Sequence, residues 1–135
     1  MTIKLEQKTP DAMAQTVRIG PHQFLSDASV AEGSLDAGPN PHDLYDAALG
    51  ACKALTVLWY ARKKGMAVTD VKTVVERDAS SERAGVYRLA ARLQVAGDIS
   101  DAQLSELAAV AAKCPVHKLM TLVTTEITTE LERMQ

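Results

Sequence analysis

The stretch NPHDLYDAALGACKALTVLWYARKKG, residues 40–65, decides the fold of this chain. Asn40 suits the N-cap of a helix, Pro41 suits the first helical position, and Asp43 stands where a capping box has its acidic residue. Gly65 is a typical residue at which a helix ends. Most residues between these two signals are apolar. The stretch therefore predicts a long central helix that is buried on most of its faces, with help from a second subunit.

The other segments divide into strands, which alternate apolar and polar residues, and helices, which begin at capping residues. The predicted strands cover residues 11–27 (two strands around a Gly-Pro-His turn), 68–78, 85–96 and 123–132. The further predicted helices cover residues 100–113 and 115–122. In chain order this gives ββ-α-ββ-α-α-β. The sequence therefore predicts an α+β fold with antiparallel sheets, in a single domain over residues 1–135.

Composition and charge exclude several classes of protein. The 135 residues carry a net charge of −2 and contain no basic tract, which is against a nucleic-acid binder. The first ten residues have no apolar run typical of a signal peptide, and no apolar run approaches the roughly 18 residues of a membrane span. We therefore expect a cytoplasmic protein without a membrane segment. Permanent structural disulfides are rare in that compartment.

One of the two cysteines, Cys114, stands in KCPVHK, residues 113–118. Pro115 suits a first helical position, so Cys114 is predicted to be the N-cap. The partial positive charge and free N–H groups of a helix N-terminus favour a thiolate, the reactive form of cysteine, and a protonated His117 would add to this effect. The alternative is that Cys114 is a small, buried and unreactive side chain.

The other cysteine, Cys52, lies in the middle of the long helix among alanines. Taken alone, this position indicates a buried, inert thiol. Gly50 weakens that interpretation, because a glycine inside a helix often permits close approach of another backbone or of a ligand. Lys53 is expected to extend its charged end to water rather than to act on Cys52.

Residues 40–65 together with KCPVHK resemble the OsmC/Ohr family, the osmotically induced protein C and organic hydroperoxide resistance proteins, in its OsmC-like branch. The family pattern is a proline-led buried helix with a cysteine in its middle, followed by a second cysteine in a Cys-Pro motif that opens a later helix. The resemblance runs from about Gly20 to the C-terminus. It implies an OsmC-like fold and an intertwined homodimer with two sites at the subunit interface.

The resemblance also implies a reaction and a role in oxidative-stress defence. Cys52 would be the peroxidatic thiol, which attacks the O–O bond of an organic hydroperoxide and becomes a sulfenic acid. Cys114 would be the resolving thiol, which converts the sulfenic acid into an intramolecular disulfide. An external dithiol reductant would then restore both thiols. No metal and no organic cofactor is required.

The chain departs from the family pattern at the residues that support the first cysteine. The family glutamate falls in an Asn-Pro-Glu motif, where this chain has His42, which could donate a hydrogen bond or a charge or could simply be solvated. The family arginine has no match in the predicted loop over residues 28–40, and Arg18 is the nearest candidate. His22 and Tyr45 are candidate substrate-binding residues, although His22 could instead be a turn or core histidine.

Two other functions are compatible with the sequence. Because the arginine and glutamate pair is missing, the chain could be a dimeric small-molecule binding or redox-sensing protein with little peroxidase turnover. A metal site at Cys114 and His117 is the third hypothesis. This pair supplies only two ligands where three or four are normal, so no metal is expected.

Overall fold

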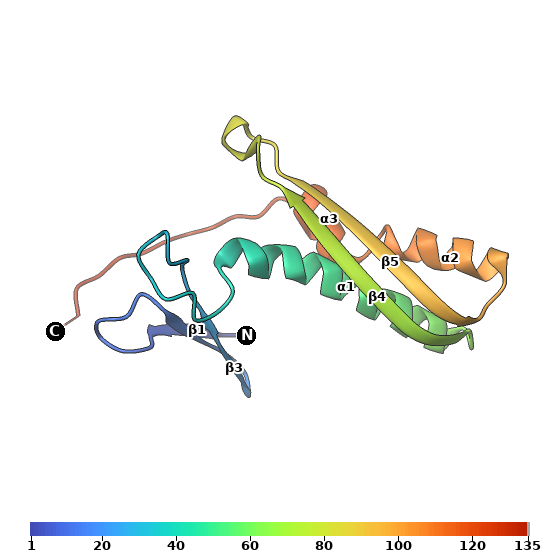
Figure 1. Ribbon diagram of the computed structural model, residues 1–135, viewed down its shortest axis with the longest axis horizontal. Coiled ribbons are helices and arrows are strands. Elements are labelled where there is room, and N and C mark those ends of the chain that lie inside the picture. Colours follow the sequence, from blue (N-terminus) through green and yellow to red (C-terminus); the bar gives the residue numbers. More distant parts are fainter. Residues whose placement is uncertain (135) are drawn as a thin grey trace. The chain divides into compact units, whose positions relative to one another are not determined.

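The computed structural model describes residues 1–134 and has the expected mixed α+β architecture with antiparallel strands (Figure 1). Its elements are β1 (Ile3–Gln7), β2 (Gln15–Ile19), β3 (His22–Ser26), α1 (Pro41–Lys63), β4 (Ala67–Asp78), the 3₁₀ turn η1 (Glu82–Ala84), β5 (Arg88–Asp98), α2 (Asp101–Ala111) and α3 (Pro115–Thr121). The chain groups into two compact units, described separately below. The first unit comprises Met1–Ala48 and Arg77–Leu89, and the second comprises Leu49–Glu76 and the residues from Ala90 onward. The single domain expected from the sequence stays a prediction.

The first unit contains a three-stranded antiparallel sheet in the order β1-β2-β3. The hairpin of β2 and β3 confirms the two strands expected in residues 11–27. Val17 in β2 is 5% exposed and marks the buried face of this sheet. The predicted element order omitted β1, whose five residues are all exposed. Backbone hydrogen bonds to one neighbour can hold an edge strand that has no buried face. Such a strand does not need alternating apolar and polar residues, so it is hard to predict from the sequence.

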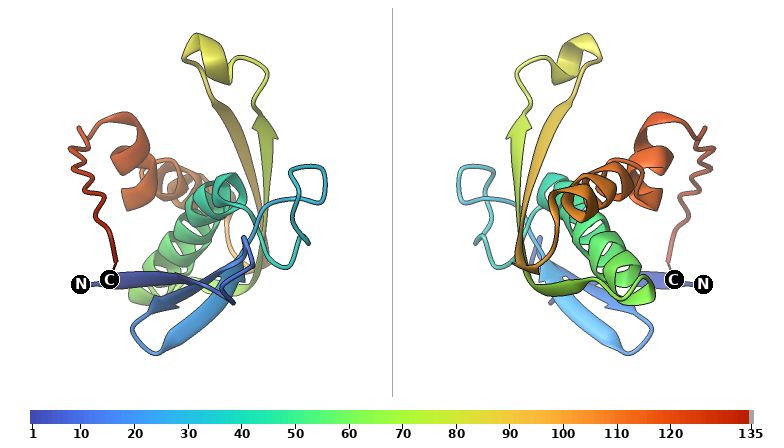
Figure 2. Two further views of the ribbon diagram at one scale, coloured as in Figure 1. Left: turned by 90° about the vertical axis from the view of Figure 1, so that its left-hand side faces the viewer. Right: turned by 90° about the vertical axis from the view of Figure 1, so that its right-hand side faces the viewer.

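The core of the second unit lies where α1 and α2 meet. Val57, Ala61 and Leu107 are at most 2% exposed, and apolar residues of β4 and β5 pack against them. A Cβ atom at Gly50 would lie 2.8 Å from Cγ2 of Val75 in β4. The glycine therefore permits close approach of the helix to a strand. β4 and β5 pair as a two-stranded sheet and run side by side in both views of Figure 2.

The helix ends are built as the sequence predicts. Asn40 and Asp43 form the capping box of α1, with the backbone N–H of Asp43 donating to Oδ1 of Asn40 at 2.8 Å and the reciprocal bond at 3.1 Å. Ser100 and Gln103 form the capping box of α2. Gly65, just after α1, has a φ of +68°, a left-handed conformation that favours glycine.

The strand predicted over residues 123–132 is absent, which corrects the element order. The described residues beyond α3 form no helix or strand, and every one of them is exposed. Ile127 is 80% and Leu131 100% exposed. A strand requires a neighbouring strand to satisfy its backbone N–H and C=O groups, and within residues 1–134 this segment has none.

One apolar face of α1 in the second unit is left uncovered. Leu55 is 65% and Trp59 60% exposed, and their spacing of four residues places them on the same side of the helix. In the single chain α1 is therefore not buried on this face, and its cover by a second subunit stays a prediction. Within residues 1–134, no helix combines the length and the apolar character needed to cross a membrane.

Candidate functional site

Cys52 lies against the first turn of α3, the helix that Cys114 caps, within the second unit. Sγ of Cys52 accepts a hydrogen bond from the backbone N–H of Val116 at 3.4 Å. Cys114 is the N-cap of α3 and Pro115 its first residue, as predicted, but the Cys114 side chain makes no capping hydrogen bond. The Val116 N–H, which has no partner within the helix, thus donates to Cys52 instead of to the N-cap side chain. A sulfur that accepts a backbone N–H is better able to carry negative charge.

The two thiols differ in exposure. Cys114 is fully buried, at 0% exposure, whereas Cys52 is partly exposed. Both cysteines are free. A reagent arriving from solvent therefore reaches Cys52 first, and Cys114 can react only with a group that is already inside the protein. This difference argues against the interpretation of Cys52 as a buried, inert thiol.

Lys53 is buried beside the same turn. The side chain was expected to extend to water, and this prediction is wrong, because Lys53 is only 7% exposed. Its Nζ donates to the backbone oxygen of Ala111, in the last turn of α2, at 2.8 Å. It also lies 3.1 Å from Nδ1 of His117. A free carbonyl at a helix C-terminus thus provides the partner that water was expected to provide.

The contact with Lys53 bears on the expected role of His117. An ammonium group can only donate hydrogen bonds, so Nδ1 of His117 is the acceptor in its contact with Lys53. The positive charge at the first turn of α3 then comes from Lys53. Lys53 was noted from the sequence, but this role was not predicted, because its partners lie 58 and 64 residues away.

A second polar cluster lies in the first unit, around Arg77. The Arg77 guanidinium donates through Nε to Asp46 and through one terminal nitrogen to Asp43 at 2.7 Å. The hydroxyl of Tyr87 donates to Oδ1 of Asp46 at 2.6 Å. The bond from Arg77 holds the pKa of Asp43 below its usual value, and the two carboxylates raise that of Arg77. Burial, followed by the bond to Asp46, raises the pKa of Tyr87.

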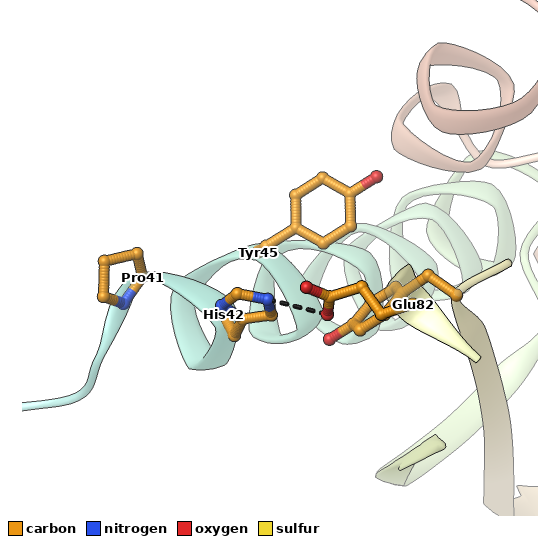
Figure 3. A pocket seen from close by; sticks show the side chains of 5 residues that line it. Pro41, His42, Tyr45 and Glu82 are labelled. Carbon is orange, nitrogen blue, oxygen red and sulfur yellow. Dashed lines mark hydrogen bonds and ion pairs between the residues drawn. The ribbon is translucent and has the colours of Figure 1, made fainter. Parts of the chain in front are cut away.

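His42 and Tyr45 line a pocket of the first unit, with a cavity of about 400 Å³. The other lining residues are Pro41, Glu82 and Tyr87. His42 and Glu82 point toward each other, with Nε2 of His42 2.9 Å from Oε1 of Glu82 (Figure 3). His42 is therefore engaged by a carboxylate rather than simply solvated. Glu82 and Tyr87 come from the connection between β4 and β5, and neither was predicted from the sequence as a site residue.

Arg18 and His22 lie on the three-stranded sheet of the first unit. Arg18 in β2 donates to Gln23 at 3.2 Å and lies 3.5 Å from a carboxylate oxygen of Glu6. His22 begins β3 and is exposed. The partners of Arg18 are thus neighbouring strand residues, and none is a predicted site residue. Within residues 1–134, no group of three or more His, Cys, Asp or Glu side chains is arranged to hold a metal ion.

Residues 32–131 match the sequence model of the OsmC-like protein family. This chain belongs to that family. Similar solved structures include an OsmC-like protein from Mycoplasma pneumoniae, 18% identical with a TM-score of 0.70 over 90% of this chain and 87% of the other. An organic hydroperoxide resistance protein, OsmC, from Legionella pneumophila is 16% identical, with a TM-score of 0.64 over 90% of each chain. The organic hydroperoxide resistance protein OhrB of Bacillus subtilis is 22% identical, with a TM-score of 0.58 over 90% of this chain and 92% of the other.

At these identities the solved structures establish the fold alone. No curated protein matches the sequence significantly. The OsmC-like fold inferred from residues 40–65 and KCPVHK is thereby confirmed.

The Arg77 cluster should make part of the stability of this OsmC-like protein depend on pH. A carboxyl whose pKa is lowered in the folded state stabilises the protein when the pH is above the ordinary pKa of that carboxyl, which is near 3.8 for Asp43. This contribution is lost as the pH falls through the pKa of the carboxyl in the folded state. We expect the melting temperature to fall less steeply below about pH 4 in Asp43→Asn than in the unmodified protein. Thermal denaturation followed by circular dichroism measures this slope. Equal slopes in the two proteins would mean that Arg77 does not favour the Asp43 carboxylate.

Proposed function

We propose that this OsmC-like protein is a thiol peroxidase that reduces organic hydroperoxides in the cytoplasm, as a defence against oxidative stress. The hydrogen bond from the Val116 N–H to Sγ of Cys52, at the turn that begins with Cys114, carries this proposal. A two-cysteine peroxidase requires stabilised negative charge on one sulfur and a second sulfur nearby. This hydrogen bond supports the first feature for Cys52, and its position at the turn of Cys114 supports the second. Two of the similar structures are named organic hydroperoxide resistance proteins.

In the first step Cys52 attacks the terminal oxygen of the hydroperoxide as a thiolate. An S–O bond forms, the O–O bond breaks, and the alkoxide leaves as an alcohol after taking a proton. Cys52 is oxidised to a sulfenic acid and the hydroperoxide is reduced. Partial exposure of Cys52 and full burial of Cys114 support this assignment of roles.

In the second step the Cys114 sulfur attacks the Cys52 sulfenic acid. An S–S bond forms, the S–O bond breaks, and the oxygen leaves as water. A dithiol reductant then supplies two electrons and two protons, which regenerates both thiols. Since Cys114 is buried, this reductant first attacks the sulfur of Cys52.

The structure gives some of the residues expected to assist Cys52 a contact near its sulfur, and others none. Lys53 contributes positive charge at the first turn of α3, since its contact residue His117 directly follows Val116, which contacts the Cys52 sulfur. His117 orients this ammonium group by accepting from it. Supporting roles for His42 and Arg18, and substrate contacts from His22 and Tyr45, stay predictions to which we assign no chemical step.

The proposal is tested by a free-thiol count with mass spectrometry, after one equivalent of tert-butyl hydroperoxide is added to the reduced protein. We expect rapid loss of both thiols and a disulfide between Cys52 and Cys114. Persistence of both thiols for many minutes would contradict the proposed peroxidase function. The protein would then be a binding protein on the same fold.

One observation favours a second function, that of a binding or redox-sensing protein with little peroxidase turnover. The position of the family glutamate is occupied by His42, which is itself held by Glu82 at 2.9 Å. A histidine paired in this way does not replace a free carboxylate as a hydrogen-bond acceptor for a peroxide. Slow formation of the disulfide, without repeated turnover when a dithiol is present, would identify a redox sensor.

We also propose that the protein is a homodimer that covers the apolar face of α1. Trp59→Glu is expected to shift the protein from dimer to monomer, because the substitution places a charge where an apolar contact is needed. Size-exclusion chromatography with light scattering measures the mass. Leu104→Glu, at a residue of α2 that is also about half exposed, is the matched control and should remain dimeric. A monomeric unmodified protein would contradict the proposal.

A further inference from the structure

The pocket of the first unit holds three aromatic rings in differing orientations. The ring of Tyr87 lies 5.9 Å from that of His42 at an interplanar angle of 64°, and 6.0 Å from that of Tyr45 at 62°. Rings tilted in this way cannot stack on both faces of a flat ligand. They can surround a compact, rounded group, which makes contact with more than one ring.

The charges around the pocket are mainly negative. Glu82 lines the cavity, and His42 engages only one of its two carboxylate oxygens. Outside the lining, Asp46 accepts from Tyr87 and shares the guanidinium of Arg77 with Asp43. Two carboxylates thus share the Arg77 guanidinium and a third, Glu82, lines the cavity, which favours a cation over an anion there.

The hydrogen bond of Tyr87 strengthens this preference. Its hydroxyl donates to Asp46 at 2.6 Å, so the hydroxyl is engaged by a carboxylate and the ring remains available to a ligand. A phenol that donates to a carboxylate has a more electron-rich ring. Such a ring attracts a cation more strongly through its π face.

The chemistry of the lining selects among cations. A primary ammonium group carries three N–H donors, whereas the charged acceptor in the lining is Glu82, one of whose oxygens already engages His42. A quaternary ammonium group has no N–H to satisfy, is apolar on its outside and carries a full positive charge. It therefore fits both the rings and the carboxylate.

We propose that this pocket binds the quaternary ammonium group of a small organic cation. The cavity of about 400 Å³ lies at the lower end of the size of small-molecule sites. The proposal goes beyond the peroxidase function and does not depend on it, because no cysteine lines the pocket. The ligand would be held through Tyr45, Tyr87 and Glu82.

The test uses the complete protein and choline as the probe, with binding followed by amide chemical shifts. We expect saturable shifts confined to the residues that line the pocket. The neutral analogue 3,3-dimethyl-1-butanol has nearly the same shape without the charge, and it should bind about tenfold more weakly. Equal binding of the two compounds would overturn the proposal, because it would indicate an apolar site only.

Variants of Tyr45 separate the effect of the ring from effects on folding. Tyr45→Leu should weaken choline binding about tenfold, whereas Tyr45→Phe, which keeps the ring, should bind as the unmodified protein does. Glu82→Gln should weaken binding as well, and Cys52→Ser should not change it. Full affinity in Tyr45→Leu, or no saturable binding of choline in the millimolar range, would contradict the proposal.

Discussion

Replacing Cys52 with serine is expected to lower the rate constant for hydroperoxide consumption by about three orders of magnitude or more, because a serine hydroxyl is a far weaker nucleophile at neutral pH than a thiolate. Cys114→Ser should leave the first step nearly unchanged. It should consume one equivalent of hydroperoxide and then stop at the Cys52 sulfenic acid, since no second thiol is present to displace the oxygen.

The contrast between these two variants tests the assignment of roles. Stopped-flow measurement with tert-butyl hydroperoxide gives the rate of the first step, and dimedone labelling with mass spectrometry locates the sulfenic acid. Circular dichroism of both variants checks that they are folded. A sulfenic acid on Cys114 in the Cys52→Ser variant, formed at the unmodified rate, would reverse the roles. Equal slow oxidation of both variants would instead indicate that neither cysteine is activated.

The central helix was predictable because its signals are local. Asn40, Asp43 and Gly65 act on backbone groups within a few residues of themselves, and the structure contains both halves of the expected capping box. The N-cap position of Cys114 follows in the same way from Pro115. Elements determined by neighbouring residues can be read from one sequence, and family membership confirms the resulting fold.

The rest depends on partners that are remote in the sequence. Lys53 is buried because a carbonyl 58 residues away accepts from it. The segment over residues 123–132 has spaced apolar residues, but a strand there requires a partner strand that residues 1–134 do not provide. Arg77 was part of an alternating strand, a pattern equally compatible with a solvated face. Only the fold reveals that Asp46 faces it.

Asp46 is the centre of the Arg77 cluster, and its removal should destabilise the protein more than that of any other member. Its side chain is 10% exposed and accepts from both Arg77 and Tyr87. Asp46→Ala leaves the Tyr87 hydroxyl and part of the guanidinium without a partner. We expect a loss of about 2 to 3 kcal/mol in the free energy of unfolding, since water reaches Arg77 in part and offsets some of the penalty.

Urea denaturation of Asp46→Ala, Tyr87→Phe and the double variant measures how this loss is divided. Tyr87→Phe removes one hydrogen bond to a carboxylate and should cost about 1.5 kcal/mol. Because the two residues share that bond, the double variant should lose less than the sum of the single variants. Asp43→Ala is the comparison variant, since its more exposed side chain also binds Arg77 and in addition accepts from the Asn40 N–H, and we expect a loss of about 1 kcal/mol. An equal loss in Asp46→Ala and Asp43→Ala would show that burial does not distinguish the two carboxylates. Strict additivity would show that Tyr87 and Asp46 act independently, and would weaken the argument that the carboxylate enriches the ring of the pocket.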